Sequence, residues 1–220
     1  MTLALMVPVK DLDRAKTRLA PLLAAAERRA LAAIMLEGTL RAGEGLEGVG
    51  RRVVVTSYRP AMELAGLHGF EVLREEGQRS ESDSVDAACA ALEREGVTAI
   101  LRVPLDLPLL RGEDLAAIVQ AARQGAQVVL VPSLDGTGTN ALYRSPPGRF
   151  PSRFGSGSLA LHMEESRRSG AEPRVLRLES LALDIDDEAD LRELARRAAP
   201  CAALDYLRSI GITERLEARK

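Results

Sequence analysis

The sequence predicts a single α/β domain of three layers, α/β/α, in which a mostly parallel sheet is covered by helices on both faces. Two observations support this prediction. Short runs of aliphatic and β-branched residues alternate with alanine-rich stretches of helical periodicity over residues 3–133. In addition, a chain of 220 residues without a long linker fits one large domain.

The first part of the chain contains five expected strands and the helices that connect them. The helical stretches place apolar residues four positions apart, as at Leu31 and Met35 or at Val85 and Cys89. The expected strands are 3–9, 52–57, 70–75, 98–103 and 126–133. The expected helices are 24–42, a short helix after Pro60, 83–95 and 112–124. Because strands joined through helices run parallel, we expect these strands to form one parallel sheet.

After residue 133 the pattern becomes less regular. Residues 135–158 are dense in Gly, Pro, Ser and Thr, and a loop of this length in a compact domain is usually functional or disordered. The apolar insert at 140–144 predicts one short strand inside this loop. The elements expected after it are a helix at 158–169, one or two strands within 174–186, a helix at 187–198 and a short amphipathic segment within 200–220.

The composition argues against several classes of function. A net charge of −2 and an aromatic content of 3% do not favour nucleic acid or an anionic membrane as a partner. The longest apolar runs have the length of strands, and charged residues occur by position 10, so we expect no membrane span, no signal peptide and a cytoplasmic location. Two cysteines and two histidines are too few for a disulfide framework or a zinc site. Any metal should therefore have oxygen ligands and be magnesium or manganese.

Asp106 is the single acid in the apolar run 101–110, directly after the fourth expected strand. Ligands of open parallel sheets bind beyond the carboxyl ends of the strands. A carboxylate among leucines is costly to bury unless a positive charge compensates it. We interpret Asp106 as a metal ligand whose charge is neutralised by a bound cation rather than by a protein side chain. The alternative is a turn carboxylate that caps local amides.

A second acidic group lies near the end of the chain. Asp184 and Asp186 alternate with Leu183 and Ile185, an arrangement that in a strand places both acids on one side. Asp186 or Asp187 also suits the N-terminus of a helix, but this role does not require Asp184. Two separate carboxylates at one cation are common in magnesium-dependent phosphate chemistry.

The segment after the first expected strand is basic, with Lys10, Arg14, Lys16 and Arg18 within nine residues. Such a loop suits a triphosphate, although a solvated charged loop explains it equally well. The chain contains neither a GxxxxGK[ST] P-loop nor a GxGxxG fingerprint. A kinase-like NTPase and an ordinary dehydrogenase are therefore disfavoured.

Glycines, hydroxyl groups and backbone amides are concentrated at 135–142 and 153–158. They suit a small anion, above all where the second segment enters the helix expected from Ser158. The alternative is a flexible surface loop. His162 lies one turn into this helix, where it either reaches the ligand loop or is a structural histidine.

Five stretches together resemble one family of enzymes. VPVKDLDRAKTRL, VPLDLPLL, DGTGTNAL, FGSGSLALH and LDIDDEADL occur in the order and spacing of the 2-phospho-L-lactate guanylyltransferases. That family also contains the phosphoenolpyruvate guanylyltransferases of deazaflavin-coenzyme biosynthesis. The resemblance covers residues 4–195 and implies a nucleotide-diphospho-sugar transferase-like fold. It implies one nucleotidyltransferase domain over residues 1–220, with a mainly nucleotide-binding half at 1–133, an acceptor-binding half at 134–200 and a tail at 201–220.

The resemblance also implies a reaction and a set of site residues. A phosphorylated three-carbon acid (2-phospho-L-lactate, phosphoenolpyruvate or a phosphoglycerate) attacks the α-phosphate of GTP, and pyrophosphate leaves, with Mg²⁺ as cofactor. Asp106 matches one metal acid, and Asp184 or Asp186 the other. Lys10 and Lys16 resemble the basic catalytic residues near the triphosphate. The other residues implied are Thr139, Asn140, Gly155 and Ser158 for the acceptor, and Val7, Ser80 and Ser84, with both lysines, for the nucleotide.

One stretch departs from the family pattern. Where relatives carry a segment similar to GLNAAL, this chain has REEGQRSESDSVDAACAAL at 74–92, so that Ser80, Ser82 and Ser84 would replace contacts to the base. This departure leaves the identity of the base and of the acid open. The alternatives are a related nucleotidyltransferase with a sugar phosphate or molybdopterin acceptor, and a non-catalytic nucleotide-binding protein. The oligomeric state is also left open, a homo-oligomer included.

Overall fold

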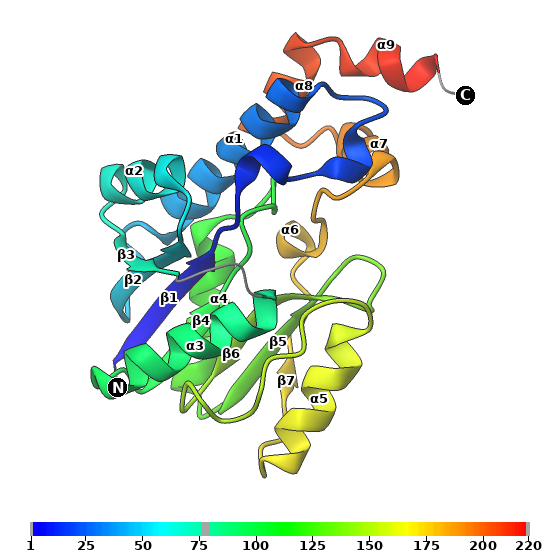
Figure 1. Ribbon diagram of the computed structural model, residues 1–220. Helices are drawn as coiled ribbons and strands as arrows, with labels where there is room; N and C mark the ends of the chain where they lie inside the picture. Colours follow the sequence, from blue (N-terminus) through cyan, green and yellow to red (C-terminus); the bar gives the residue numbers. More distant parts are fainter. Residues whose placement is uncertain (1, 76–79, 219–220) are drawn as a thin grey trace.

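One seven-stranded sheet lies at the centre of the computed structural model, which describes residues 2–75 and 80–218 (Figure 1). The strand order is β3-β2-β1-β4-β6-β5-β7. The strands are β1 (Leu3–Pro8), β2 (Val49–Thr56), β3 (Glu71–Arg74), β4 (Ala99–Arg102), β5 (Val128–Pro132), β6 (Thr139–Arg144) and β7 (Arg174–Val175). β6 runs antiparallel to β4 and β5, and the other pairs are parallel. The prediction of a mostly parallel sheet is confirmed.

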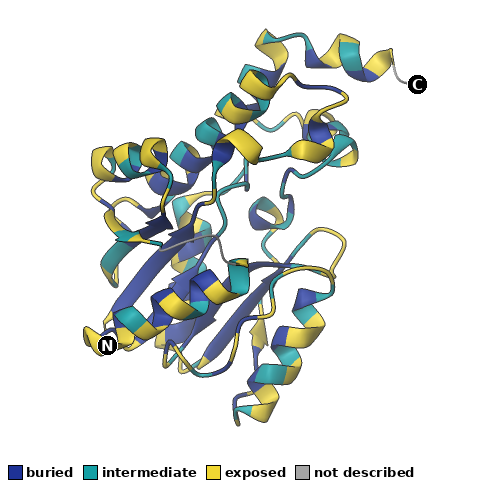
Figure 2. Ribbon diagram, in the orientation of Figure 1, coloured by how far each residue is buried: buried dark blue, intermediate teal, exposed yellow. Residues whose placement is uncertain are grey.

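Helices cover both faces of this sheet, as the sequence predicted. The helices α1 (Ala25–Gly43), α2 (Arg59–Leu67) and α4 (Gly112–Arg123) pack on one face, and α3 (Glu81–Arg94) and α5 (Ser158–Arg168) pack on the other. β1 shows why two layers are needed: Leu3 and Leu5 belong to the cluster with α1, whereas Ala4 and Met6 belong to the cluster with α3. Figure 2 shows the central strands buried, the edge strands β3 and β7 largely exposed, and the helices exposed on their outer sides.

A separate apolar cluster lies beyond one end of the sheet. Two short 3₁₀ segments, η1 (Leu12–Arg14) and η2 (Thr17–Leu19), follow β1. The helices after β7 are α6 (Glu179–Ala182), α7 (Glu188–Arg197), α8 (Ala202–Ser209) and α9 (Ile212–Glu217). Leucines of α7, α8 and α9 pack with Leu31 and Met35 of α1 and with the segment after η2. The C-terminal segment is therefore a pair of docked helices. Among the described residues, no helix is long and apolar enough to cross a membrane.

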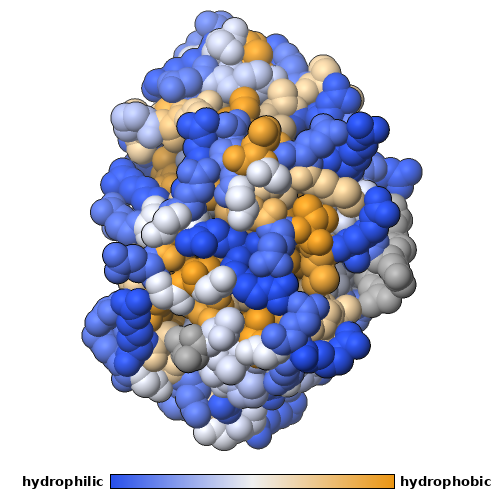
Figure 3. Space-filling view, turned by 90° about the vertical axis from the view of Figure 1, so that its left-hand side faces the viewer, coloured by the Kyte–Doolittle hydropathy of each residue, from blue (hydrophilic) through white to orange (hydrophobic). Residues whose placement is uncertain are grey.

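The side of the molecule that carries β3 and α2 is shown in Figure 3. Hydrophilic side chains cover most of this face, and apolar ones lie scattered among them. Leu67 of α2 and Val72 of β3 are among the exposed apolar residues. Exposed apolar residues that are dispersed in this way are normal on a protein surface.

The segment 174–186 differs from its prediction. Only residues 174–175 form a strand; α6 follows, and 183–186 is extended but outside the sheet. The backbone N–H of Ile185 donates to the carbonyl of Asp106 at 3.1 Å, so this segment pairs with the loop after β4. Leu183 and Ile185 are buried, at 1% and 0% exposure. The alternation of apolar and acidic residues thus has the predicted effect without a strand.

Candidate active site

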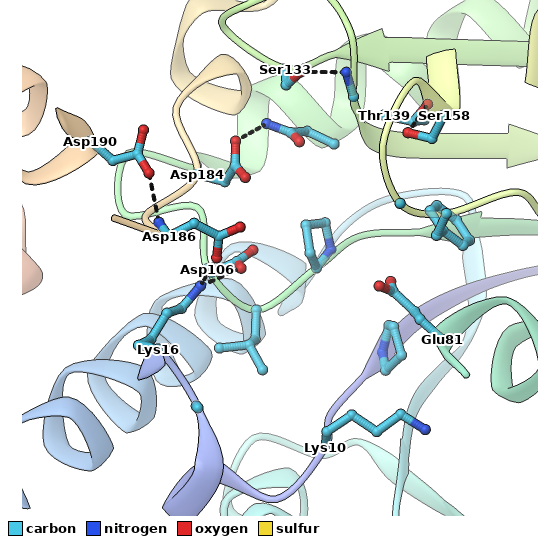
Figure 4. Close-up of a pocket in the computed structure, with 18 of the residues that line it drawn as sticks. Lys10, Lys16, Glu81, Asp106, Ser133, Thr139, Ser158, Asp184, Asp186 and Asp190 are labelled. Atoms are coloured by element: carbon cyan, nitrogen blue, oxygen red, sulfur yellow. Dashed lines mark hydrogen bonds and ion pairs between the residues drawn. The ribbon is translucent and has the colours of Figure 1, made fainter. Parts of the chain in front are cut away.

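A cavity of about 1110 Å³ lies beyond the carboxyl ends of the parallel strands. Its wall is formed by the segments that follow β1, β2, β3, β4 and β5, together with the loop before α5 and the acidic segment before α7. Ligand sites of open parallel sheets occur at this edge, so the cavity lies where the sequence placed the site. Figure 4 shows the side chains that face it.

Lys16 and two acids form the centre of one end of this cavity. The Nζ of Lys16 donates to Oδ2 of Asp106 at 2.6 Å and to Oδ1 of Asp186 at 2.9 Å (Figure 4). The Lys16 side chain is 6% exposed, and its backbone has the left-handed conformation, with φ at 55°. We call Lys16, Asp106 and Asp186 the acid–lysine cluster. The expectation that a bound cation alone neutralises Asp106 is wrong for this structure, because a protein ammonium does so.

The charges of this cluster shift one another's pKa. Burial alone would lower the pKa of Lys16, but Asp106 and Asp186 outweigh it and hold that pKa above its usual value. Burial opposes ionisation of Asp106, yet the nearby ammonium lowers the pKa of this carboxyl. Asp184 behaves differently: burial and repulsion from Asp106 raise its pKa to about 6. Only part of the acidic group is therefore neutralised by Lys16.

The oxygen ligands fit a divalent cation of the magnesium type. Among the described residues, no three acidic, histidine or cysteine side chains are arranged around one metal position. Asp106 and Asp186 are instead arranged around the ammonium of Lys16. Magnesium is usually held by one or two carboxylates and completes its shell with water and substrate phosphates. Asp106 and Asp186, with Asp184 beside them, meet this requirement.

Asn140 lines the cavity and also supports the acidic segment. Its Nδ2 lies within hydrogen-bond distance of the carbonyls of Leu181 and Ala182, at 2.7 and 3.0 Å, and of Oδ1 of Asp184, at 3.2 Å. Asp190 contributes from the other side, where its carboxylate accepts from the backbone N–H of Asp186 at 2.8 Å. Asn140 thus positions Asp184, and the acceptor contact that the sequence suggested stays a prediction.

Thr139, Ser158 and His162 form a hydroxyl site at the other side of the cavity. Ser158 Oγ donates to Thr139 Oγ1 at 3.3 Å, and Nδ1 of His162 lies 3.0 Å from the same oxygen. Nε2 of His162 accepts from the backbone N–H of Arg153 at 2.8 Å, so the ring proton is on Nδ1 and is donated to Thr139. Burial lowers the pKa of His162 to about 3, and the ring is neutral. Of the two alternatives, His162 is the structural histidine.

This arrangement leaves the hydroxyl hydrogen of Thr139 available to a ligand, because its oxygen already accepts from two donors. Gly155 lies next to this site and lines the cavity, with φ at 122°, a conformation that disfavours side chains. Ser158 is the first residue of α5, where its own N–H donates to the carbonyl of Gly155 at 3.2 Å and the N–H of Leu159 donates to the carbonyl of Thr137 at 2.9 Å. Thr139, Gly155 and Ser158 are therefore brought together as the sequence suggested.

Three residues expected at the nucleotide lie away from the cavity wall of the described chain. Val7 is buried in β1, Ser80 caps α3 by accepting from the N–H of Asp83 at 3.1 Å, and Ser84 is 2% exposed in α3. Ser82 accepts from the N–H of Phe154 at 2.9 Å. These side chains have structural partners, so the suggestion that the serines replace contacts to the base does not agree with this geometry. Residues 76–79 of the divergent stretch lie outside the described residues.

Arg102 and Glu81 were missed by the sequence analysis, yet both line the cavity. Arg102 is 4% exposed, donates to Glu81, and holds its guanidinium 4.1 Å from the centre of the Phe154 ring. Its Nε is buried without a partner among the described atoms, and burial lowers the pKa of the guanidinium to about 10. The sequence did contain a signal for Arg102, because this charged residue lies within 98–103, a run expected to form a buried strand.

Comparison with known proteins identifies the relatives of this chain. The family described as "Guanylyl transferase CofC like" matches residues 3–219. The phosphoenolpyruvate guanylyltransferase of Rubrobacter xylanophilus is 39% identical over 196 residues, which are 88% of this chain and 94% of that protein. The 2-phospho-L-lactate guanylyltransferase of Methanothermobacter thermautotrophicus is 31% identical over 208 residues, 94% of this chain and 91% of that protein.

A solved structure with the same fold comes from Desulfovibrio desulfuricans and is described as a nucleotide-diphospho-sugar transferase. It superposes with a TM-score of 0.76 at 16% identity and covers 98% of this chain and 99% of its own. This likeness confirms the expected nucleotide-diphospho-sugar transferase-like fold.

Proposed function

The chain belongs to the CofC-like guanylyl transferase family, and from this premise we propose that it transfers GMP from GTP to a phosphorylated three-carbon acid and releases pyrophosphate. One observation carries the proposal: the acid–lysine cluster and the hydroxyl site of Thr139 and Ser158 face the same cavity. A cation-binding end and an anion-binding end in one cavity suit a reaction that joins two phosphorylated substrates.

We propose Mg²⁺ as the cofactor, held by Asp106 and by Asp184 or Asp186. The ion would screen the repulsion between the two substrates and stabilise charge on the α-phosphate and the departing pyrophosphate. If a metal ion were held by these carboxylates, it would weaken their attraction for Lys16, whose ammonium could then turn to the triphosphate.

The acceptor is proposed to bind at the hydroxyl site. Thr139 has a hydroxyl hydrogen to donate, and Gly155 and Ser158 lie where α5 begins. The attacking phosphate is a dianion near neutral pH, so the reaction needs no strong general base. His162 is buried and neutral, and in this proposal it orients Thr139 without exchanging protons with the substrate.

Phosphoenolpyruvate is the first acceptor to test. The phosphoenolpyruvate guanylyltransferase relative is 39% identical, compared with 31% for the 2-phospho-L-lactate relative. We further propose that the reaction occurs in the cytoplasm and serves biosynthesis of a deazaflavin redox coenzyme, as the sequence resemblance implies.

The test is pyrophosphate release with GTP and Mg²⁺ in the presence of phosphoenolpyruvate, 2-phospho-L-lactate or a phosphoglycerate. Release is expected with one acid, and Asp106→Asn is expected to lower kcat by at least about 100-fold, because it removes a charge needed to stabilise the transition state. Asp205→Asn, on the surface of α8, is the matched control and should leave kcat unchanged. Absence of release from a folded protein that binds GTP would favour a different acceptor or a non-catalytic protein.

A further inference from the structure

A second charged pair lies in the cavity, apart from the acid–lysine cluster. Lys10 follows β1 and Glu75 follows β3, and both line the cavity wall. The Nζ of Lys10 is 2.8 Å from Oε1 of Glu75 and 2.6 Å from Oγ of Ser84. Figure 4 shows the ammonium of Lys10 pointing away from Lys16 and Asp106. The two lysines therefore belong to different parts of the site.

Glu75 is held in a fixed orientation. Its side chain is 7% exposed, and its Oε1 accepts from both Lys10 and Ser84. Ser84 is itself buried in α3, so it fixes the ammonium and the carboxylate relative to each other. Glu75 lines the cavity, and a carboxylate has a second oxygen, here Oε2, that can accept a hydrogen bond from a ligand.

The order of the strands places this pair at a useful distance from the proposed reaction centre. Glu75 follows β3 and Asp106 follows β4, and β2 and β1 lie between these strands. Three strand spacings correspond to about 14 Å. The base and sugar of a nucleotide can cover such a distance when its α-phosphate lies at the acid–lysine cluster. With the α-phosphate at the acid–lysine cluster, the base of the nucleotide then lies beside Lys10 and Glu75.

We propose that Lys10 and Glu75 recognise guanine: Lys10 donates to O6, and Oε2 of Glu75 accepts from N1–H and the adjacent amino group. This inference rests on the proposed function and assigns its base selectivity. Guanine presents an acceptor beside two donors, which complements an ammonium beside a carboxylate. Adenine presents an amino group to the ammonium and an unprotonated nitrogen to the carboxylate, so both contacts become repulsive. We predicted from sequence that Lys10 lies near the triphosphate; its contacts with Glu75 and Ser84 assign it to the base.

Equilibrium binding of GTP, ITP, ATP and UTP by calorimetry, with Mg²⁺ and without an acceptor, tests this assignment in the wild-type protein. GTP should bind about 10–100-fold more tightly than ATP, because adenine reverses the donor and acceptor positions. ITP lacks only the amino group and should bind more weakly than GTP. UTP has an oxygen and an N–H in the same order but a shorter ring, and it should also bind more weakly. Equal affinities for GTP and ITP, together with equal affinities for GTP and ATP, would overturn the inference.

Variants supply an independent test. Glu75→Gln should lower the GTP-to-ATP affinity ratio at least about 10-fold, because an amide both donates and accepts. Lys10→Met should lower the same ratio. Glu71→Gln is the matched control, because Glu71 lies on β3 and pairs with Arg51, and neither residue is among those that line the cavity. The GTP-to-ATP affinity ratio of this variant should equal that of the wild type. A wild-type ratio in Glu75→Gln would overturn the role of Glu75.

The two proposals can fail separately. If the wild type prefers GTP to ATP in the binding experiment but forms no product with any acid, the proposed transfer reaction is wrong and the base assignment stands. If the protein forms product from GTP and ATP with equal kcat/KM, the base assignment is wrong and nucleotidyl transfer stands.

Discussion

At the scale of single residues, Lys16 determines the charge balance of the site. Its ammonium compensates Asp106 and Asp186, which otherwise repel each other. A divalent cation bound as proposed would therefore compete with Lys16 for these carboxylate oxygens. Metal affinity would then depend on whether another anion, such as a triphosphate, attracts the lysine.

Lys16→Met should increase the affinity for Mn²⁺ in the absence of nucleotide by about 10-fold, because it removes the competing charge. The variant should also melt at a lower temperature without metal and regain stability when Mg²⁺ is added, since breaking a partly buried ion pair leaves Asp106 uncompensated. Electron paramagnetic resonance of Mn²⁺ and thermal unfolding measure these effects. Unchanged Mn²⁺ affinity would show that Lys16 does not compete with the metal ion. Arg18→Met, in the same basic segment, is the control.

His162 gives a prediction about acid stability. Its pKa in the fold is about 3, below the ordinary value of 6.5, because burial disfavours the charged ring. The unfolded chain therefore binds more protons between these values, and the free energy of unfolding falls as the pH decreases from about 6.5 towards 3, by at most about 1.4 kcal/mol per pH unit. Denaturant unfolding at several pH values should show a shallower decrease for His162→Gln. Gln120→Ala, at an exposed position of α4 that does not titrate, should retain the wild-type slope.

The residue contacts that the sequence could not predict are those between distant positions. Asp106 was identified as a functional acid because it interrupts an apolar run. Its partner Lys16 is 90 positions away, and only the fold brings the two together. Arg102 was missed for a similar reason, since its partners Glu81 and Phe154 come from other parts of the chain.

At the scale of secondary-structure elements, β6 and the segment after α6 position the acidic group. Asn140 of β6 donates hydrogen bonds to the carbonyls of Leu181 and Ala182 at the end of α6 and to the carboxylate of Asp184 in the segment after it. A residue on a rigid central strand thereby fixes a segment that has no regular structure of its own. The orientation of Asp184 depends on this contact.

Asn140→Ala should weaken Mn²⁺ binding by about 10-fold and lower the free energy of unfolding by about 1–3 kcal/mol, because buried carbonyls lose their donor. The KM for GTP should change less than the metal affinity. Titration with Mn²⁺ and denaturant unfolding measure the two effects. Gln124→Ala, at the end of α4, removes a side-chain amide far from the cavity wall and should change neither value. Wild-type Mn²⁺ affinity in Asn140→Ala would contradict the positioning role.

The elements that the sequence predicted well are those with a clear period. Aliphatic runs and helical spacing identified five parallel strands and the helices between them. The order of the strands in the sheet was not predictable. The sequence indicated a short strand at 140–144, but its insertion between β4 and β5 as β6 depends on tertiary pairing. The strands expected within 174–186 were mostly wrong, since a period of two also describes an extended segment that packs against a loop.

At the scale of the whole molecule, the C-terminal helices support the proposed reaction centre. Leu204 and Leu207 of α8 lie in one apolar cluster with Leu19, which follows Lys16, and with Ile185, which precedes Asp186. Both sides of the acid–lysine cluster are thus anchored to the same packed group.

Leu204→Ala should lower the free energy of unfolding by about 2–5 kcal/mol, because it leaves a cavity in this cluster. It should also weaken Mn²⁺ binding, although Leu204 does not line the cavity among the described residues. Thermal unfolding and metal titration provide the measurements. Leu161→Ala, at a position that is 43% exposed, should change the stability by less than about 0.5 kcal/mol. Loss of stability without any change in metal affinity would separate the cluster from the site.

The order of the site residues along the chain also has a consequence for how such an enzyme diversifies. Lys10, Glu75 and Lys16 precede residue 90, whereas Thr139, Gly155 and Ser158 follow residue 130, so the two proposed substrates are recognised by different stretches of the gene. Mutations in the later stretch can alter the accepted acid while base selection persists. Descendants of one ancestral protein can therefore exchange one small acid for another and continue to draw on the same nucleotide pool.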